Sequence, residues 1–259
     1  MNYINKTLNK INIIGILILL VVLLIVTTGL GSLFKMEITE SWAYLGLIMF
    51  FIYALRDCRE DFISKLYSIF DTFSFKSILS IVILNIFFSY GMLLIIDLFS
   101  NSVLFLGQTI TLNSAKNLAI AGGIFSTVII APIFEEILFR GVFLQKLKSY
   151  FKLPVAIILT AVLFGVIHNV GGMISAAVFG ICMCILYIKS GNILVPIFAH
   201  FLNNLIAELI STVDSSNLIF SNHILMFLFG ILAIISAYLL FVSLKNEFKQ
   251  LTDKNESKK

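Results

Sequence analysis

Charge is what this sequence most lacks. Only 12% of its 259 residues are charged, whereas about 25% are charged in an average soluble domain. Hydrophobic residues make up 59% of the chain, and the mean hydropathy is +1.05. The sequence also lacks the alternation of apolar and polar residues in segments of about ten that marks a membrane β-barrel. These absences exclude a soluble domain and predict an integral membrane protein built from helices.

Cysteine and proline are rare as well, with three of each. Cys182 and Cys184 lie two apart, on different faces of a predicted helix, so we expect neither a disulfide nor a metal pair. No repeat, proline-rich linker or low-complexity segment divides the chain. We therefore expect a single membrane domain over 1–259 that ends in a cytoplasmic polar tail, residues 244–259.

Apolar runs of about twenty residues recur along the sequence, and each is long enough to cross a hydrocarbon core of about 30 Å. They predict an all-α, polytopic bundle with about eight transmembrane helices. The first run is longer than the apolar core of a signal peptide and precedes no Ala-x-Ala site, so we expect it to be retained. The predicted spans are 11–34, 41–55, 77–99, 118–139, 155–169, 172–188, 193–210 and 223–243.

Basic residues gather in alternate connections between these spans, including the segment before the first and the segment after the last. The other connections carry little beyond Lys35 and Lys116. Because Lys and Arg favour the cytoplasmic side, both termini are predicted to be cytoplasmic in a multi-pass protein of the cell membrane. Residues 56–76 have an amphipathic pattern typical of a helix on the membrane surface. The net charge of +4 is spread over loops and tails, so we expect no nucleic-acid partner.

Three polar clusters interrupt the apolar spans. Ionisable residues inside a membrane are costly and mark a functional site by default. Counting 1.5 Å per residue from the predicted turns puts the three clusters at similar depths, roughly 14–25 Å above them, so they can form one site. Their ionisable and amide side chains are Glu135, Glu136, Arg140, His168, His200 and Asn204.

Helix geometry predicts different roles for the first cluster's side chains. Glu136 and Arg140 are four residues apart and can pair on one helix face, which gives them a supporting role. Glu135 points about 100° away around the helix and needs another partner. A lone carboxylate there suits a group that takes and returns a proton.

The second and third clusters supply partners for that carboxylate. His168 is a candidate partner for Glu135, with Phe164 one turn earlier on the same face. His200 and Asn204 are four apart and project together, so they can present hydrogen-bond donors to one point.

Two chemistries fit these residues. In the first, Glu135 and His168 activate a water that attacks an amide carbonyl, and His200 and Asn204 stabilise the oxyanion. In the second, zinc is bound by His168, His200 and Glu135, since two His and one Glu form a catalytic zinc set. His-Glu-x-x-His, Gly-x-Ser-x-Gly and Gly-x-Gly-Asp are absent, which argues against the usual zinc, serine and aspartyl intramembrane proteases.

The clusters resemble the motifs of the CAAX protease and bacteriocin-processing family of intramembrane endopeptidases, which are related to the Ras-converting enzyme. The matching motifs are Glu-Glu-x-x-x-Arg at Glu135, Phe-x-x-x-His at Phe164, and His-x-x-x-Asn at His200. The resemblance implies an eight-helix fold, a catalytic core over 118–210, and peptide-bond hydrolysis by a glutamate mechanism without a metal. The alternative for that family is a zinc mechanism, in which zinc would be the cofactor.

The expected partners are the lipid bilayer and a membrane-associated peptide or protein substrate. Composition and short loops look bacterial, and relatives in Gram-positive bacteria act in peptide maturation and bacteriocin self-immunity, so we expect a substrate of that kind. The alternative function is a non-catalytic membrane scaffold or immunity protein that keeps the motifs for packing and partner binding. A proton-coupled transporter is a third hypothesis, although no inverted repeat of the transporter kind is evident.

Overall fold

The computed structural model describes residues 3–34, 41–102, 123–169, 172–214, 216 and 218–256, and every regular element within these ranges is a helix. Side chains of 3, 72–74, 98–102, 123, 252 and 254–256 are not described. In chain order the elements are α1 (Tyr3–Lys10), α2 (Ile13–Phe34), α3 (Ser41–Ala54), η1 (Arg56–Cys58), α4 (Arg59–Leu66), η2 (Tyr67–Phe70), α5 (Thr72–Ser102), α7 (Gly123–Phe125), η3 (Ser126–Ile130), α8 (Ala131–Glu136), η4 (Ile137–Phe143), α9 (Leu144–Tyr150), α10 (Leu153–Val166), α11 (Met173–Ser190), α12 (Leu194–Val213), α13 (Leu218–Ser221) and α14 (His223–Glu256).

Five of the described helices are long and apolar enough to cross a membrane: α2, α5, α11, α12 and α14. The shorter helices α3 and α10 are also apolar. This confirms the all-α, multi-pass class, and seven of the eight predicted spans each coincide with one of these helices. The remaining predicted span, 118–139, begins outside the described residues, as do Lys35 and Lys116.

Among the boundaries that differ from the prediction, two concern predicted polar segments. Helix α10 ends at Val166, because Ile167 and His168 belong to a turn. His168 therefore follows the helix instead of lying within it. Helix α14 continues to Glu256, so the described part of the predicted polar tail is helical.

The helical segment from Gly123 to Tyr150 contains two π-helical stretches, η3 and η4, on either side of α8. Pro132 lies where η3 runs into α8, and because it has no N–H it cannot donate a hydrogen bond to the preceding turn. π-turns inside helices are rare and occur frequently at functional sites. The short α8 carries Glu135 and Glu136, so the two glutamates lie between the two distorted turns.

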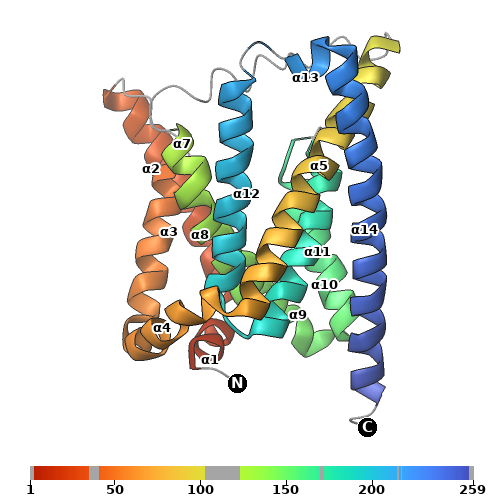
Figure 1. Ribbon diagram of the computed structural model, residues 1–259. Coiled ribbons are helices and arrows are strands. Elements are labelled where there is room, and N and C mark those ends of the chain that lie inside the picture. Colours follow the sequence, from red (N-terminus) through yellow and green to blue (C-terminus); the bar gives the residue numbers. More distant parts are fainter. Residues whose placement is uncertain are drawn as a thin grey trace.

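Figure 1 shows α2 and α3 on one side of the bundle beside α7 and α8, with α12 crossing the middle and α5, α10, α11 and α14 on the other side. Both chain ends lie at the same end of the bundle, where α1, α4 and α9 also lie (Figure 1). Only 6% of the most apolar stretch of α2 is buried inside the protein, compared with 50% of the most apolar stretch of α11. The core is therefore concentrated around α8 to α12.

Small residues allow α10 and α11 to approach closely. A Cβ atom built on Gly165 would lie 2.9 Å from the Ala177 Cβ and 2.8 Å from the Met173 carbonyl oxygen. A Cβ atom on Gly180 would lie 3.2 Å from the Ala161 Cα. Close backbone contact through small residues is the usual basis of helix association in membranes, and it holds α11 against the helix that leads to His168.

The amphipathic helix α1 was not anticipated from the sequence. Ile4 and Leu8 are fully buried on one of its faces, and the Tyr187 hydroxyl donates a hydrogen bond to Oδ1 of Asn5 at 2.6 Å. Leu8 lies against Gly141, whose missing Cβ leaves room for the leucine side chain. Helix α1 therefore covers the end of the segment that carries the glutamates.

Candidate active site

Glu136 lies at the centre of a fully buried charged cluster. Its Oε1 atom lies 2.9 Å from Nη1 of Arg140 and 2.8 Å from Nδ1 of His200. The side chains of Glu136 and Arg140 are completely buried, and that of His200 is 5% exposed. The pairing of Glu136 with Arg140 is as predicted, whereas the bond to His200 was missed because it joins residues 64 positions apart.

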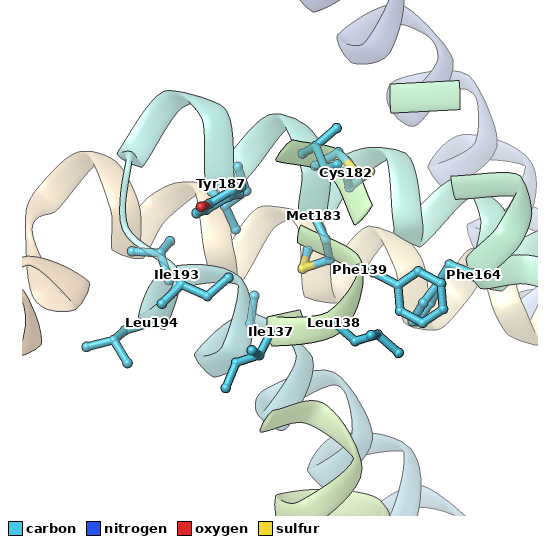
Figure 2. Close-up of a cluster of buried hydrophobic side chains, with 14 of the residues drawn as sticks. Ile137, Leu138, Phe139, Phe164, Cys182, Met183, Tyr187, Ile193 and Leu194 are labelled. Carbon is cyan, nitrogen blue, oxygen red and sulfur yellow. The ribbon is translucent and has the colours of Figure 1, made fainter. Parts of the chain in front are cut away.

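Arg140 has further partners besides Glu136. Its Nη2 donates to the Gly180 carbonyl at 3.3 Å, and its guanidinium lies 4.5 Å from the centre of the Phe164 ring. Figure 2 shows Phe164 beside Phe139 in the surrounding apolar cluster, with ring centres 5.2 Å apart. Phe164 therefore supports the site by covering the buried cation, an arrangement that offsets part of the cost of desolvating it.

The Glu136 bond fixes the proton position on His200. A carboxylate paired with Arg is ionised and only accepts hydrogen bonds, so Nδ1 of His200 carries the proton. Its Nε2 atom then points the other way, and it lies 3.9 Å from Oε2 of Glu135. A carboxylate that holds an imidazole ring through Nδ1 is also the arrangement of the Ser-His-Asp triad.

Glu135 differs from its neighbour in having no partner at hydrogen-bond distance among the described residues, whereas Glu136 is held through Oε1 and leaves only its Oε2 unbonded. The side chain of Glu135 is 14% exposed, and its Oε2 is buried without a hydrogen-bond partner among the described protein atoms. Buried polar atoms are nearly always hydrogen-bonded, so an exception of this kind requires an explanation. A reacting water that donates a hydrogen bond of about 2.8 Å to this oxygen supplies one.

His168 follows the end of α10, and its own helix orients its ring. Its Nδ1 donates to the Phe164 carbonyl at 2.7 Å, and the two rings lie 4.7 Å apart. Its Nε2 is thus left as the atom available for proton chemistry. The Phe164 ring that contacts His168 also contacts the ring of His200, with centres 5.8 Å apart, so one aromatic side chain lies against both histidines.

Asn204 is part of a row of three amides. Its Nδ2 donates to the Thr127 carbonyl at 2.9 Å, and its Oδ1 accepts from Nδ2 of Asn203 at 3.3 Å. Oδ1 of Asn203 in turn accepts from Nδ2 of Asn85 on α5 at 2.9 Å. With Oδ1 occupied, Asn204 keeps one N–H free of these bonds and can donate it to another group.

Asn85 and Asn203 were not among the predicted site residues. Asn85 on α5 donates to Asn203 on α12, which makes it an interhelical partner of the site. Its 4% exposure in an otherwise apolar helix is the signal that could have connected it to the site. Glu208, one turn after Asn204 on α12, accepts a hydrogen bond from the Thr127 hydroxyl at 3.3 Å.

The possible zinc ligands Glu135, His168 and His200 are not gathered as a metal site. Among the described residues, no group of three or more His, Cys, Asp or Glu side chains is gathered closely enough to hold a metal ion. Glu136 also occupies one nitrogen of His200, and the Phe164 carbonyl occupies one of His168. These two bonds leave Nε2 of each histidine available and are of the kind that ligating histidines also make, so the separation of the three side chains is what argues against a three-ligand centre.

Residues 117–206 match the family described as "Type II CAAX prenyl endopeptidase Rce1-like", and this range includes every predicted site residue. The chain is also 32% identical over 77 residues to YdiL, a candidate membrane peptidase of Bacillus subtilis (strain 168). That match covers 29% of this chain and 32% of the length of YdiL. No solved structure matches the chain significantly.

Proposed function

We propose that this chain, in which residues 117–206 form an Rce1-like CAAX prenyl endopeptidase domain, is an intramembrane endopeptidase of the glutamate type. The observation that carries the proposal is the pair of unlike neighbours Glu135 and Glu136. Glu136 is held through Oε1 by Arg140 and His200, whereas Glu135 has no hydrogen-bond partner among the described protein atoms, and Oε2 is buried and unbonded in both. A buried free carboxylate beside two oriented imidazoles suits general-base catalysis.

In the first step, Oε2 of Glu135 takes a proton from a water while Nε2 of His168 orients the same water. The water oxygen forms a bond to the carbonyl carbon of the substrate, and the carbonyl π electrons move to its oxygen. Proton transfer by a positioned side chain of this kind typically contributes about 10²- to 10⁴-fold to the rate.

The resulting oxyanion is stabilised by His200 and Asn204. His200 donates from Nε2 as an imidazolium, whose charge is balanced by Glu136 through Nδ1. Asn204 donates through the second N–H of its side-chain amide, the one that is not bonded to the Thr127 carbonyl. Glu135 then returns its proton to the leaving nitrogen as the C–N bond breaks, which yields a carboxylic acid and an amine and restores the site. Removing one such donor typically costs about 10²- to 10³-fold in kcat.

The proposed substrate is a membrane-associated peptide or protein, as in peptide maturation or bacteriocin self-immunity. The proposed setting is a bacterial cell membrane crossed by about eight helices with both termini in the cytoplasm. The shared end of the two termini in Figure 1 and the alternate distribution of basic loops support this topology. Residues 118–210 are the proposed catalytic core.

Glu135→Gln is the direct test, because glutamine keeps the size of the side chain but cannot accept the water proton. We expect cleavage of a quenched leader-peptide library in proteoliposomes to fall by about 10³-fold or more, while the unfolding midpoint stays unchanged. Glu208→Gln is the matched control, since Glu208 lies outside the proposed chemistry. Full cleavage by Glu135→Gln would contradict the glutamate mechanism and leave the non-catalytic scaffold as the better function.

The proposed reaction uses no metal or other cofactor. We therefore expect activity to survive exhaustive chelation. Metal analysis of the chelated protein should then find less than about one zinc per ten chains. Loss of activity on chelation, with recovery on adding back zinc alone, would instead support the set Glu135, His168 and His200.

A further inference from the structure

A groove of about 260 Å³ lies between α5, α11 and α14 at the end of the bundle where both chain termini lie. The groove is separate from the candidate active site, because none of its lining residues belongs to the charged cluster or to the amide row. Its walls come from three helices, so it has a defined shape. The lining residues are Lys76, Ser77, Ser80, Ile81, Leu84, Cys182, Ile185, Leu186, Lys189, Leu240, Ser243, Leu244 and Glu247.

The groove changes from charged to apolar along the helices. Lys76, Lys189 and Glu247 lie nearest the end of the bundle, while Leu84 and Leu240 lie two turns or so deeper, about 10–12 Å away at 1.5 Å per residue. Serine hydroxyls occupy the level between them. This sequence of charge, hydroxyl and hydrocarbon is the same as that of a phospholipid from its headgroup to its acyl chains.

The mouth of the groove, formed by Lys76, Lys189 and Glu247, favours an anion. Lys189 is paired with Glu247 at 2.7 Å. Lys76 is exposed, and no ion pair with it is found among the described side chains. The mouth therefore has one positive charge in excess, which a phosphate or phosphatidyl headgroup would neutralise. Basic pockets between transmembrane helices are known sites for anionic lipid headgroups.

The groove also opens towards the lipid. Leu79 and Ile83, which lie on α5 next to the lining residues, are exposed apolar side chains, as expected for a face in contact with acyl chains. A soluble anion would use only the mouth and leave the apolar depth unused. Ile81, Leu84 and Leu240 give the acyl chain of a lipid a surface to pack on.

We propose that this groove is a binding site for one anionic phospholipid, with its phosphate beside Lys76 and Lys189 and an acyl chain along Ile81, Leu84 and Leu240. The site is separate from the proposed peptidase centre. Its occupancy does not depend on whether the chain cleaves peptides.

The test is native mass spectrometry of the full chain released from nanodiscs of equal phosphatidylglycerol and phosphatidylcholine. We expect one retained phosphatidylglycerol, preferred over phosphatidylcholine. Lys76→Gln should lower that preference by about fivefold, the effect of one basic residue near an anionic lipid. Lys245→Gln, on α14 but outside the groove lining, should change nothing.

A second pair of variants tests the apolar depth. Ser80→Trp would fill the groove and should abolish retention, whereas Leu79→Trp on the neighbouring lipid-facing position should retain the lipid. A photoactivatable acyl-chain probe on phosphatidylglycerol should label peptides of α5 and α14 in Leu79→Trp but not in Ser80→Trp. Unfolding midpoints measured for both tryptophan variants ensure that loss of the lipid is compared between folded proteins.

Three results would overturn the proposal. The first is equal retention of phosphatidylglycerol and phosphatidylcholine, and the second is unchanged labelling in Ser80→Trp. The third is full displacement by glycerol phosphate, which has the headgroup charge but no acyl chains and would indicate a soluble-anion site.

Discussion

Two polar networks cross the core of this protein, and they differ in charge. The charged cluster of Glu136, Arg140 and His200 is almost entirely buried and joins the α8–η4 segment to α12. The amide row of Asn85, Asn203 and Asn204 is neutral and joins α5 to α12 and η3. Breaking the first leaves an uncompensated buried charge, whereas breaking the second leaves an unpaired amide. The charged cluster should therefore dominate stability, while the amide row mainly orients a donor.

The largest effect is expected for Arg140→Met, which removes the cation and leaves the Glu136 carboxylate buried with only His200 as partner. We expect the free energy of unfolding to fall by about 3–5 kcal/mol, measured by reversible unfolding in mixed micelles. The double variant Glu136→Gln/Arg140→Met should recover part of the loss, because the unpaired charge is gone. Equal losses in the single and double variants would show that the two side chains are not coupled.

A smaller effect is expected for Asn85→Leu, which removes the donor to Asn203. The unfolding free energy should fall by about 1–3 kcal/mol, the usual cost of leaving a buried polar atom unpaired. Peptide cleavage should slow as well. Without its bond to Asn85, the side chain of Asn203 is less constrained, so its hydrogen bond to Oδ1 of Asn204 orients Asn204 less well. If Asn85→Leu destabilises as much as Arg140→Met, the contrast between the two networks is wrong.

Thr127→Val separates the two groups that Thr127 contributes. The variant removes the hydroxyl that donates to Glu208 but keeps the carbonyl that accepts from Asn204. We expect a loss of about 0.5–1.5 kcal/mol in stability and an unchanged cleavage rate. A large loss of cleavage without a change in fold would instead assign Glu208 to the reaction.

The smallest effect is expected outside both networks, on α2. Ile18 is 59% exposed, and its surroundings there are lipid, which is as apolar as the side chain. Ile18→Ala should change the unfolding free energy by less than about 0.5 kcal/mol. A substantially larger loss would show that α2 packs against a further surface in the bilayer.

The sequence was sufficient for the helical class and for most of the spans, because apolar length alone decides whether a segment can cross a bilayer. It was also sufficient for the pair Glu136 and Arg140, since spacing of four residues puts two side chains on one helix face. Local signals failed where helices were irregular: α10 ends before His168, and π-turns flank α8. Helix α1 was missed because its eight residues are too few to resemble a membrane span.

By itself, then, the sequence determined which side chains are polar at membrane depth and that two of them, Glu136 and Arg140, pair. Only the tertiary structure decided that His200 binds Glu136 through Nδ1 and leaves Nε2 facing Glu135. It alone decided that Asn85 reaches Asn204 through Asn203. Both contacts join residues that are far apart in the chain, and their geometry depends on how the helices cross. Local spacing contains no information about that crossing, because it is set by close contacts such as Gly180 against Ala161.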